Sequence, residues 1–381
     1  MSVTAPSLIG SVPGKVALDA APLIGRALPN AHRRNGFDAL RILAAMMVVY
    51  GHAFPLTGHI PPALFGNAVG TVGVKIFFVI SGFLVTRSWL GDARLAAFAM
   101  RRALRILPAL ACVVTVTVLL VGPIFTTLPL PEYFASPATH AYFWNVGLYP
   151  DYFLPGVFAG NRYPIAVNGS LWSLPAEVLM YILTPLVISR SAETARVSLL
   201  VFAACCAIAD VYFARIAPPA SPTVIYGTNL ASVLEVAVYF QAGAIWAVFG
   251  LERYARPGFA VLLMAVAFLT VRVVGGGTAS AAVQEMLLIL VLPFASVSLG
   301  CVHLGGAPGR LLARADISYG LYLYGFPAQQ AVAATLGRSF GPIGNFVLVL
   351  PLVVACACLS WIFVERPALR LKPRGRRLAR S

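Results

Sequence analysis

The sequence predicts an all-α protein, a polytopic integral membrane bundle of about ten transmembrane helices. Of the 381 residues, 59% are hydrophobic and 11% are charged, and the mean hydropathy is +0.84. This composition is typical of membrane proteins, in which each helical span needs about 20 apolar residues. Suitable runs lie near residues 40–57, 69–89, 106–126, 171–189, 197–213, 229–249, 258–274, 282–301, 317–334 and 343–363.

The basic residues predict how these spans are oriented. With the N-terminus inside, 22 of the 28 Lys and Arg residues fall on cytoplasmic segments, and the opposite side holds only Arg162, Arg215, Arg272 and Arg338. This bias follows the positive-inside rule and predicts that both termini are cytoplasmic. We expect the basic tail "ERPALRLKPRGRRLAR" to bind anionic lipid headgroups, and we expect no nucleic-acid partner despite the net charge of +15.

Three segments divide the chain. Residues 1–36 are rich in Ala, Pro and Gly and lack the apolar core of a cleaved signal, so they are predicted to be a flexible cytoplasmic arm. Residues 37–367 form one predicted membrane domain, and residues 368–381 form a basic cytoplasmic tail. All six cysteines lie inside predicted spans, where cysteine acts as a small apolar residue, so we expect no disulfide and no metal site.

The first span carries an arginine and a histidine in "RILAAMMVVYGH", residues 41–52. Eleven helical steps place Arg41 and His52 on one face, about 16 Å apart along the axis. A histidine there can act as a general base, or it can be a buried imidazole that holds two helices together. Arg41 can anchor an anionic ligand, or it can extend to the cytoplasmic headgroups.

The second span, "GVKIFFVISGFLVTRSW", carries Lys75 in its outer half and a Ser81-Gly82 pair. Ionisable residues inside a span usually face the protein interior or a wet cavity, so Lys75 is a candidate ligand-binding residue. Ser81-Gly82 predicts either a close approach of a ligand to the backbone or a notch for helix packing.

The following segment, "RLAAFAMRRALRILP", places Arg102 and Arg105 on one helical face. Two guanidinium groups spaced in this way can hold a phosphate or pyrophosphate. The alternative is an interfacial helix bound to acidic lipids.

The longest predicted loop, about 127–170, is crowded with aromatic residues. Aromatic faces stack on sugar rings, so Trp144 and Tyr152 are candidate acceptor-binding residues, with Asn168 and Trp172 at the end of the loop. The alternative is an aromatic belt at the outer headgroups.

The fourth span begins in "NGSLWSLPAEVLMYI", where Ser170 or Ser173 can cap the helix and Pro175 lies in its first turns. Glu177 lies deep enough to be an ion-pair partner or a participant in proton transfer. Weaker candidates of the same kind, each with a good chance of being structural, are Glu235, Glu285 and Asp316.

Together these motifs resemble the membrane-bound acyltransferase 3 family, whose members O-acylate sugars of O-antigens, exopolysaccharides and nodulation factors, and in some cases macrolide antibiotics. The resemblance covers about residues 37–367. Its motifs are Arg41 with His52, "FFVISGFL" (77–84), Arg102 with Arg105, "NGSLWSLPAE" (168–177), "ISYGLYLYGFP" (317–327) and "VERP" (364–367).

The resemblance implies a bundle of about ten spans in the bacterial cytoplasmic membrane that moves an acyl group, most simply acetyl, from cytoplasmic acyl-CoA to a carbohydrate or glycosylated acceptor. It implies no permanently bound cofactor. His52 matches the family's essential histidine, Arg41 its partner arginine, and Arg102 with Arg105 its basic pair. Two departures stand out: many relatives have a second histidine where this chain has Gly325, and some carry a soluble hydrolase-like domain at the C-terminus.

The expected mechanism has His52 deprotonate the acceptor hydroxyl, with Glu177 orienting or balancing the charge of the site. The expected acyl-CoA-binding residues are Arg41, Lys75, Ser81, Arg102 and Arg105. A covalent acyl-enzyme on Ser81 or a cysteine is less favoured, because no base-activated nucleophile motif is visible. The alternative functions are a secondary transporter and a polysaccharide or lipid export component.

Overall fold

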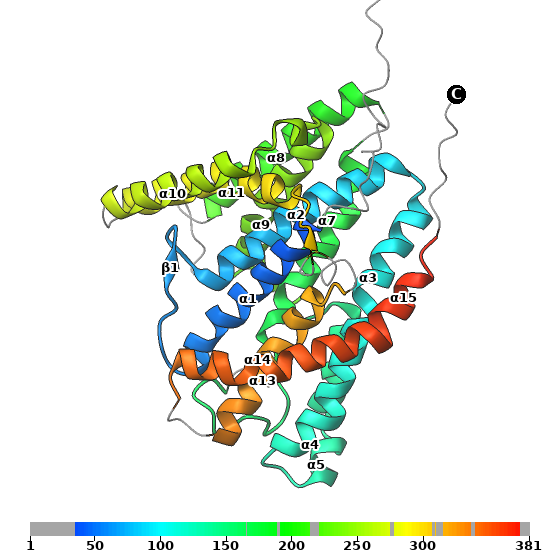
Figure 1. The fold of residues 1–381 in the computed structure, drawn as a ribbon. Helices are drawn as coiled ribbons and strands as arrows, with labels where there is room; N and C mark the ends of the chain where they lie inside the picture. The colour runs from blue at the N-terminus through cyan, green and yellow to red at the C-terminus, as the bar shows by residue number, and fades with distance from the viewer. Residues whose placement is uncertain are drawn as a thin grey trace, which may run out of the picture.

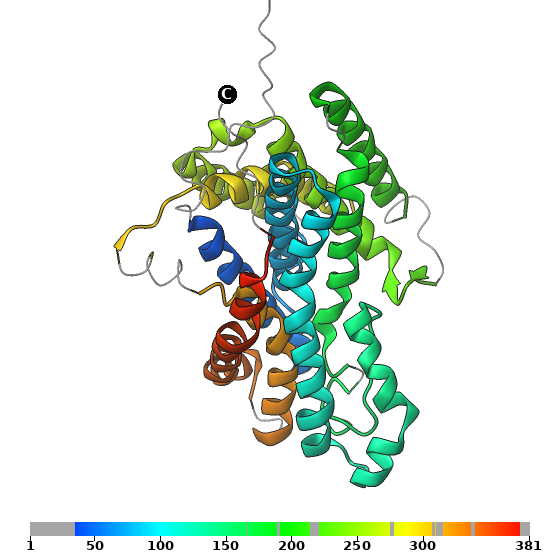
Figure 2. The ribbon, with the colours of Figure 1, turned by 90° about the vertical axis from the view of Figure 1, so that its right-hand side faces the viewer.

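A computed structural model describes residues 35–164, 166–188, 191–213, 221–274, 278–306, 309, 315–336 and 340–373. The chain forms a helical bundle (Figures 1 and 2). The predicted N-terminal arm, except residues 35–36, and the tail beyond residue 373 lie outside the described residues.

Long helices make up the bundle, and each predicted span overlaps one of them. α3 continues through a π-helical turn, Thr117–Val121, into α4, so that it runs along most of the bundle (Figure 2). The long helices are α1 Gly36–Leu56, α2 Val69–Gly91, α3 Leu95–Val116, α7 Ser173–Val187, α8 Ala192–Val211, α9 Leu230–Val248, α10 Pro257–Val274, α11 Thr278–Gly300, α13 Ser318–Leu336 and α14 Pro342–Ser360.

Eight helices among the described residues are long and apolar enough to cross a membrane. α10 is apolar but shorter, and α13 is not among the eight. The predicted class, a membrane bundle of helices, is therefore confirmed, while the count of about ten spans stays a prediction.

Short elements connect the long helices. Two antiparallel hairpins pair Ala63 with Ala68 and Val224 with Asn229. The short elements are β1 Ala63–Leu64, β2 Asn67–Ala68, α4 Gly122–Phe125, α5 Leu130–Ala135, α6 Pro137–Ala141, β3 Val224–Ile225, β4 Thr228–Asn229, α15 Arg366–Arg370, a π-helical turn Trp361–Glu365, and the 3₁₀ turns Tyr142–Gly147, Gly169–Trp172 and Leu251–Tyr254.

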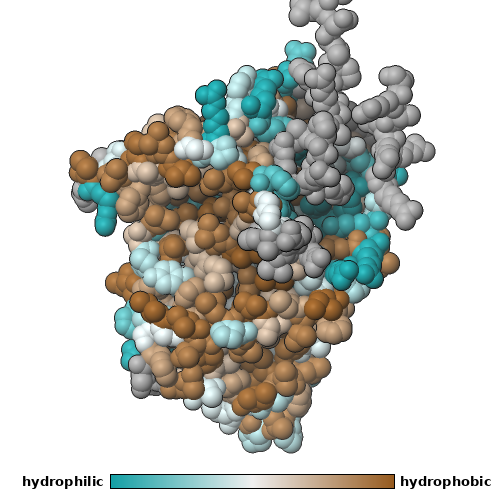
Figure 3. All heavy atoms as spheres, in the orientation of Figure 1, coloured by the Kyte–Doolittle hydropathy of each residue, from teal (hydrophilic) through white to brown (hydrophobic). Residues whose placement is uncertain are grey.

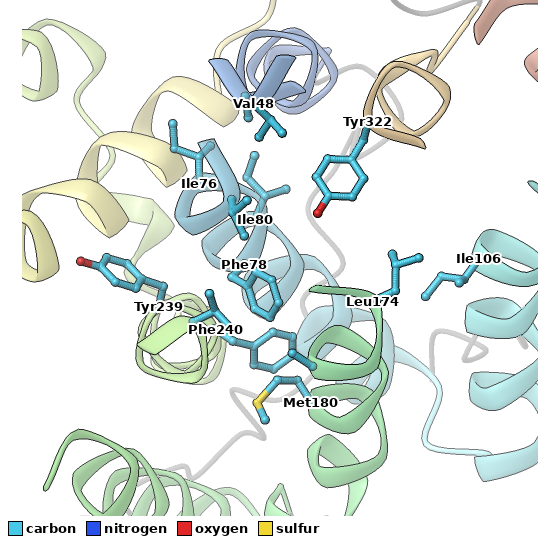
Figure 4. Close-up of a cluster of buried hydrophobic side chains, with 14 of the residues drawn as sticks. Val48, Ile76, Phe78, Ile80, Ile106, Leu174, Met180, Tyr239, Phe240 and Tyr322 are labelled. Carbon is cyan, nitrogen blue, oxygen red and sulfur yellow. The ribbon is translucent and has the colours of Figure 1, made fainter. Parts of the chain in front are cut away.

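α2 is the central helix, with 78% of its span buried, and it packs against α1 and α9. Glycines make the contact with α9 close: a methyl group on Gly82 would collide with the carbonyl of Phe240, and one on Gly243 with the carbonyl of Val79. Gly82 is therefore the packing notch that one interpretation of Ser81-Gly82 predicts. Large apolar side chains fill the space around α2 (Figure 4).

The outside of the bundle is apolar over a wide area, as Figure 3 shows for one face. Val273 is 85% exposed, Leu186 74% and Phe363 69%. Apolar exposure on this scale is costly in water and favourable in lipid. The chain is thus a multi-pass membrane protein.

Candidate active site

One cavity of the described structure, the first cavity, has a volume of about 330 Å³ and lies between α1, α2, α3, α7 and α13. Five of the predicted site residues line it together: Arg41, Ser81, Arg102, Arg105 and Glu177. On α7, Ser173, Glu177 and Tyr181 are spaced four residues apart on one face, so the cavity extends about 12 Å along this helix.

One end of the cavity is basic. Arg105 donates a hydrogen bond to Asp316 at 2.7 Å, and Arg41 lies 3.6 Å from the same carboxylate. Arg102 has no ion pair among the described residues; its buried Nε has no hydrogen-bond partner, and its guanidinium lies against the ring of Tyr181. Arg102 is half-buried, and a guanidinium without an ion pair at the wall of a cavity can bind an anionic ligand.

Lys372 adds a fourth basic group to this end, from the segment after α15. Burial, together with repulsion from Arg105, Arg102 and Arg41, lowers the pKa of Lys372 to about 8. Burial opposes ionisation of Asp316, but Arg105 and Arg41 outweigh it and lower its pKa to about 2. Asp316 is not the only acid here, because Asp38 pairs with Arg41 at 3.2 Å and Glu365 lies 3.8 Å from Arg105. Arg102 and Lys372 form no ion pair with any described residue, so they carry the positive charge that is available to an anionic ligand.

Glu177 lies in the middle of the cavity and is held by hydroxyl groups. Ser81 Oγ donates to Glu177 Oε1 at 2.9 Å, and Tyr181 OH donates to the same oxygen. Gly82 packs on α9 while Ser81 lines the cavity, so the packing notch is confirmed and the approach of a ligand to Ser81-Gly82 stays a prediction.

The far end of the cavity is closed by Ser173 and Tyr322, whose hydroxyls are hydrogen bonded to each other. Tyr322 OH lies 2.7 Å from the carbonyl of Ser170, which accepts a hydrogen bond from it. Ser170 itself is 1% exposed, and its Oγ has no hydrogen-bond partner in the described structure. Buried polar atoms are nearly always paired, so this hydroxyl is a candidate hydrogen-bond donor to a substrate group.

His52 lies beyond this end and does not line the cavity. Its ring is edge-on to Phe326, with 5.0 Å between centroids, and its Nδ1 is buried without a partner among the described residues. A Cβ on Gly169 would lie 2.7 Å from Cε2 of the same Phe326. Phe326 is thus a common neighbour of His52 and of the turn that carries Ser170.

Lys75 lies outside this site. Its ammonium group is fully buried and contacts Glu235 at 2.9 Å, Glu285 at 2.8 Å and Asn67 at 2.8 Å. Glu235 and Glu285 are therefore ion-pair partners of Lys75, and Asp316 is the partner of Arg105, which is the structural role that the sequence allowed for each.

The predicted acceptor-binding residues are not brought together. Trp144 is 68% exposed on the surface, and Trp172 is partly buried against the main core. Asn168 caps the turn at 169–172, accepting from Ser170 N and donating to Leu323 O. Tyr152 alone packs beside Phe326 and hence near His52.

Sequence reasoning did not single out Ser170 as an unpaired hydroxyl, nor Tyr181, Tyr322 and Lys372 as parts of the site. A signal was present in the hydroxyl-rich stretches "NGSLWSLP" and "ISYGLYLYGFP", whose polar residues interrupt apolar runs. Lys372 belonged to the tail that was assigned to lipid binding.

Comparison with known proteins gives matches over most of the chain. The family model described as "Acyltransferase domain" matches residues 34–365. The chain is 30% identical to the "O-acetyl transferase" of Shigella phage Sf6 over 340 residues, which cover 88% of this chain and 96% of that protein. It is 31% identical to "Nodulation protein 10" of Rhizobium leguminosarum bv. viciae, over 89% of this chain and 94% of that protein.

A shorter match links the chain to "O-acetyltransferase OatA" of Staphylococcus aureus (strain NCTC 8325 / PS 47), 31% identical over 165 residues, which cover 40% of this chain and 24% of that protein. No solved structure matches the chain.

Proposed function

Because the chain belongs to the acyltransferase-domain family, we propose that this membrane O-acyltransferase takes its acyl group, most simply acetyl, from acyl-CoA at the cytoplasmic side and transfers it to a carbohydrate hydroxyl. The enzyme class and the membrane setting follow from the family and the fold. The donor, the side of the membrane and the kind of acceptor are the proposal.

The observation that supports acyl-CoA as the donor is the basic end of the first cavity. Arg41, Arg102, Arg105 and Lys372 line it; Arg41 pairs with Asp38 and Asp316, and Arg105 pairs with Asp316 and Glu365. Arginine forks bind phosphate oxygens in pairs, and the phosphates of CoA would pair with Arg102 and Lys372, which form no ion pair with any described residue. Glu177 adds a polar group to the cavity wall beyond these basic residues.

The length of the site fits a thioester carried on an extended arm. Arg41 and His52 lie eleven residues apart on one helix, about 16 Å along its axis, which is comparable with the reach of a pantetheine arm. With the phosphates at the basic end, the thioester would lie near Ser173 and Tyr322, close to Ser170 and His52. Binding at one end thus positions the reacting carbonyl at the other.

The proposed chemistry is a direct transfer. His52 accepts the proton of the acceptor hydroxyl, whose oxygen forms a bond with the thioester carbonyl carbon. The Ser170 hydroxyl donates a hydrogen bond to the oxygen that becomes negative, and the carbon–sulfur bond then breaks. The thiolate leaves and takes the proton from His52, so that an ester and free CoA are the products.

Binding and turnover with labelled acetyl-CoA test the proposal, using the full chain in lipid vesicles. Arg102→Ala should weaken acetyl-CoA binding about 10- to 100-fold, since hydrogen bonds to charged groups contribute about 1.5–3 kcal/mol. Arg253→Ala is the matched control, because Arg253 is an exposed arginine that does not line the cavity. Equal binding by the two variants would contradict the assignment of the donor site.

The same preparation tests the activity itself. With a panel of polysaccharides as acceptors, labelled acetyl should appear as an alkali-labile ester on the glycan. Movement of label or of glycan across the membrane without any ester would instead support the transporter or export alternative.

A further inference from the structure

A second cavity, with a volume of about 370 Å³, lies at the other end of α1. The end of α1, α4, the 156–162 loop, the end of α13 and the start of α14 enclose it. Its volume falls at the lower end of the range of about 300–1,000 Å³ found for ligand sites. None of the residues that the sequence assigned to donor or acceptor lines it.

His52 lies between the two cavities. Leu56 lines the second cavity and follows His52 by four residues, on the same face and about 6 Å further along α1. Leu56 also belongs to one buried cluster with Phe326, the ring that lies edge-on to His52. Arg41, in the first cavity, lies about 16 Å from His52 in the opposite direction.

The second cavity has one charged lining residue in the described structure, Arg162. No carboxylate lines it, and Arg162 forms no ion pair with any described residue. Gly58 has φ +78°, and a Cβ there would lie 3.0 Å from Arg162 Nη1, so the guanidinium lies across the turn that ends α1. Arg162 is exposed, and because no described carboxylate lines the cavity its guanidinium can pair with an anionic group that enters there.

The wall that carries Arg162 is fixed to α13. The Asn161 side chain donates to both the backbone and the side-chain oxygen of Gln330, at 2.9 and 2.7 Å. Gln330 is fully buried and donates in turn to the carbonyls of Tyr163 and Ala166. The loop is therefore held in place before any ligand binds, which lowers the entropic cost of binding.

We propose that the second cavity is the acceptor site and that it takes the end of an acidic glycan, whose carboxylate or phosphate pairs with Arg162 while a hydroxyl points toward His52. This inference rests on the proposed acyl transfer. The cavity volume suits a sugar residue rather than a long chain segment. The phosphate can belong to the glycan or to a lipid that carries it, since Ile124 and Phe340, at 62% and 41% exposure, give the cavity an apolar flank.

Direct binding is the first test, because it does not depend on acyl transfer. The probes are a glucuronic acid-containing oligosaccharide, its glucose counterpart, and a hexose linked to a prenyl phosphate. The wild-type chain should bind the two anionic probes, and Arg162→Ala should weaken that binding about tenfold or more. Arg162→Lys should recover part of it. Arg272→Ala is the control, since Arg272 does not line the cavity.

Turnover is the second test. Arg162→Ala should raise KM for the anionic acceptors about tenfold, leave the glucose counterpart within about twofold, and leave hydrolysis of acetyl-CoA by water unchanged. Ala333→Phe, which fills the cavity, should block transfer to all acceptors and spare hydrolysis. If Arg162→Ala impaired transfer only to the prenyl phosphate probe, the anion bound by Arg162 would be the phosphate of the lipid carrier.

Three results would overturn the inference and leave the proposed function in place. The first is normal transfer by Ala333→Phe. The second is equal affinity and equal KM of Arg162→Ala and Arg272→Ala for the anionic probes, and the third is binding of anionic phospholipid in place of any glycan. Glycan binding that depends on Arg162 with no acetyl transfer in the wild type would instead contradict the proposed function.

Discussion

His52 Nδ1 and Ser170 Oγ are buried polar atoms for which the described residues offer no hydrogen-bond partner. A hydrogen bond to a buried polar group is worth about 1–3 kcal/mol, so both atoms are candidates to bind the reacting hydroxyl and carbonyl. His52 and the turn that carries Ser170 both lie beside Phe326, beyond the far end of the first cavity. This is the chemical reason for placing the transfer step there.

Replacing His52 with Ala should reduce acyl transfer about 100- to 10,000-fold, the usual contribution of a general base. The variant should still insert in the membrane and bind acetyl-CoA, because the basic groups of the cavity lie about 16 Å away. Initial rates and acetyl-CoA affinity measure this, and near-normal turnover would rule out the role of base.

Ser170→Ala should lower kcat about tenfold or more if the hydroxyl stabilises the oxyanion, and should leave the melting temperature unchanged or slightly higher. Removing a hydroxyl that has no partner does not cost a hydrogen bond. Ser198→Ala is the control, since that hydroxyl donates to the carbonyls of Val187 and Thr194 away from the site. A loss of stability without a loss of kcat would assign Ser170 a structural role.

Lys372 should make acetyl-CoA binding depend on pH. Its folded pKa of about 8 is below its usual value of 10.5, so above pH 8 it loses its charge in the folded chain and attracts the anion less. Affinity should therefore fall as pH rises through about 8. The ligand-free protein should become more stable between pH 8 and 10.5, where the unfolded chain binds more protons.

Titration of acetyl-CoA affinity between about pH 6.5 and pH 9.5 measures the effect of Lys372, compared with Lys372→Met, which should lack this part of the pH dependence. Asp316 stays ionised over the whole range, because its pKa is about 2. Identical pH profiles of the two proteins would contradict a role for Lys372 in binding.

At the scale of elements, the contact between α2 and α9 holds the cavity wall in place. Gly82→Ala should destabilise the protein by about 1–3 kcal/mol, because the added methyl group collides with the carbonyl of Phe240 and packed helices resist overpacking. Gly91→Ala, on the same helix, has no atom within 4 Å of the added methyl. It should be neutral or stabilising. Thermal unfolding in detergent compares the two, and equal melting temperatures would contradict the close contact.

α1 has a different task, since it carries a residue for each part of the proposed reaction. Arg41 faces the first cavity, His52 lies beyond its far end, and Leu56 faces the second cavity. A rigid helix keeps these distances constant, which in the proposed reaction would position donor and acceptor without any loop having to close.

At the scale of the whole molecule, Lys75 joins three helices. It pairs α2 with Glu235 of α9 and Glu285 of α11, and Tyr239 OH donates to Glu285 as well. Removing one partner of a buried ion pair leaves an uncompensated charge, at a cost of about 3–5 kcal/mol. The network therefore determines how α11 docks on the bundle.

Lys75→Met should lower the folded yield and the melting temperature, and the double variant Lys75→Met with Glu285→Gln should recover part of both, because one uncompensated charge is gone. In the surviving protein, the KM for acetyl-CoA should stay within about twofold, since Lys75 does not line the cavity. A large rise in the KM for acetyl-CoA, with an unchanged melting temperature, would instead support the acyl-CoA-binding role that the sequence suggested for Lys75.

The sequence by itself determined the fold class and identified five of the residues that line the first cavity. Spans are visible because hydrophobicity is a local property of about 20 residues, and positive charge marks their ends. Arg41 and His52 share α1, and Arg102 and Arg105 share a face of α3, because the helical repeat relates them without help from the rest of the chain. Ser81 and Glu177 line the same cavity as the three arginines, but they lie 96 residues apart and meet only through the tertiary structure.

Tertiary structure alone decided the contacts that depend on how each helix is rotated about its axis. Lys75 is 210 residues from Glu285, and Tyr322 is 152 residues from Ser170, so no local pattern relates them. A span that is apolar on all sides does not indicate which of its faces points inward, and its rotation is set by close packing at residues such as Gly82. The pairing of Lys75, the unpaired Ser170 hydroxyl and the cavity beside Arg162 follow from that packing, which is why the sequence did not reveal them.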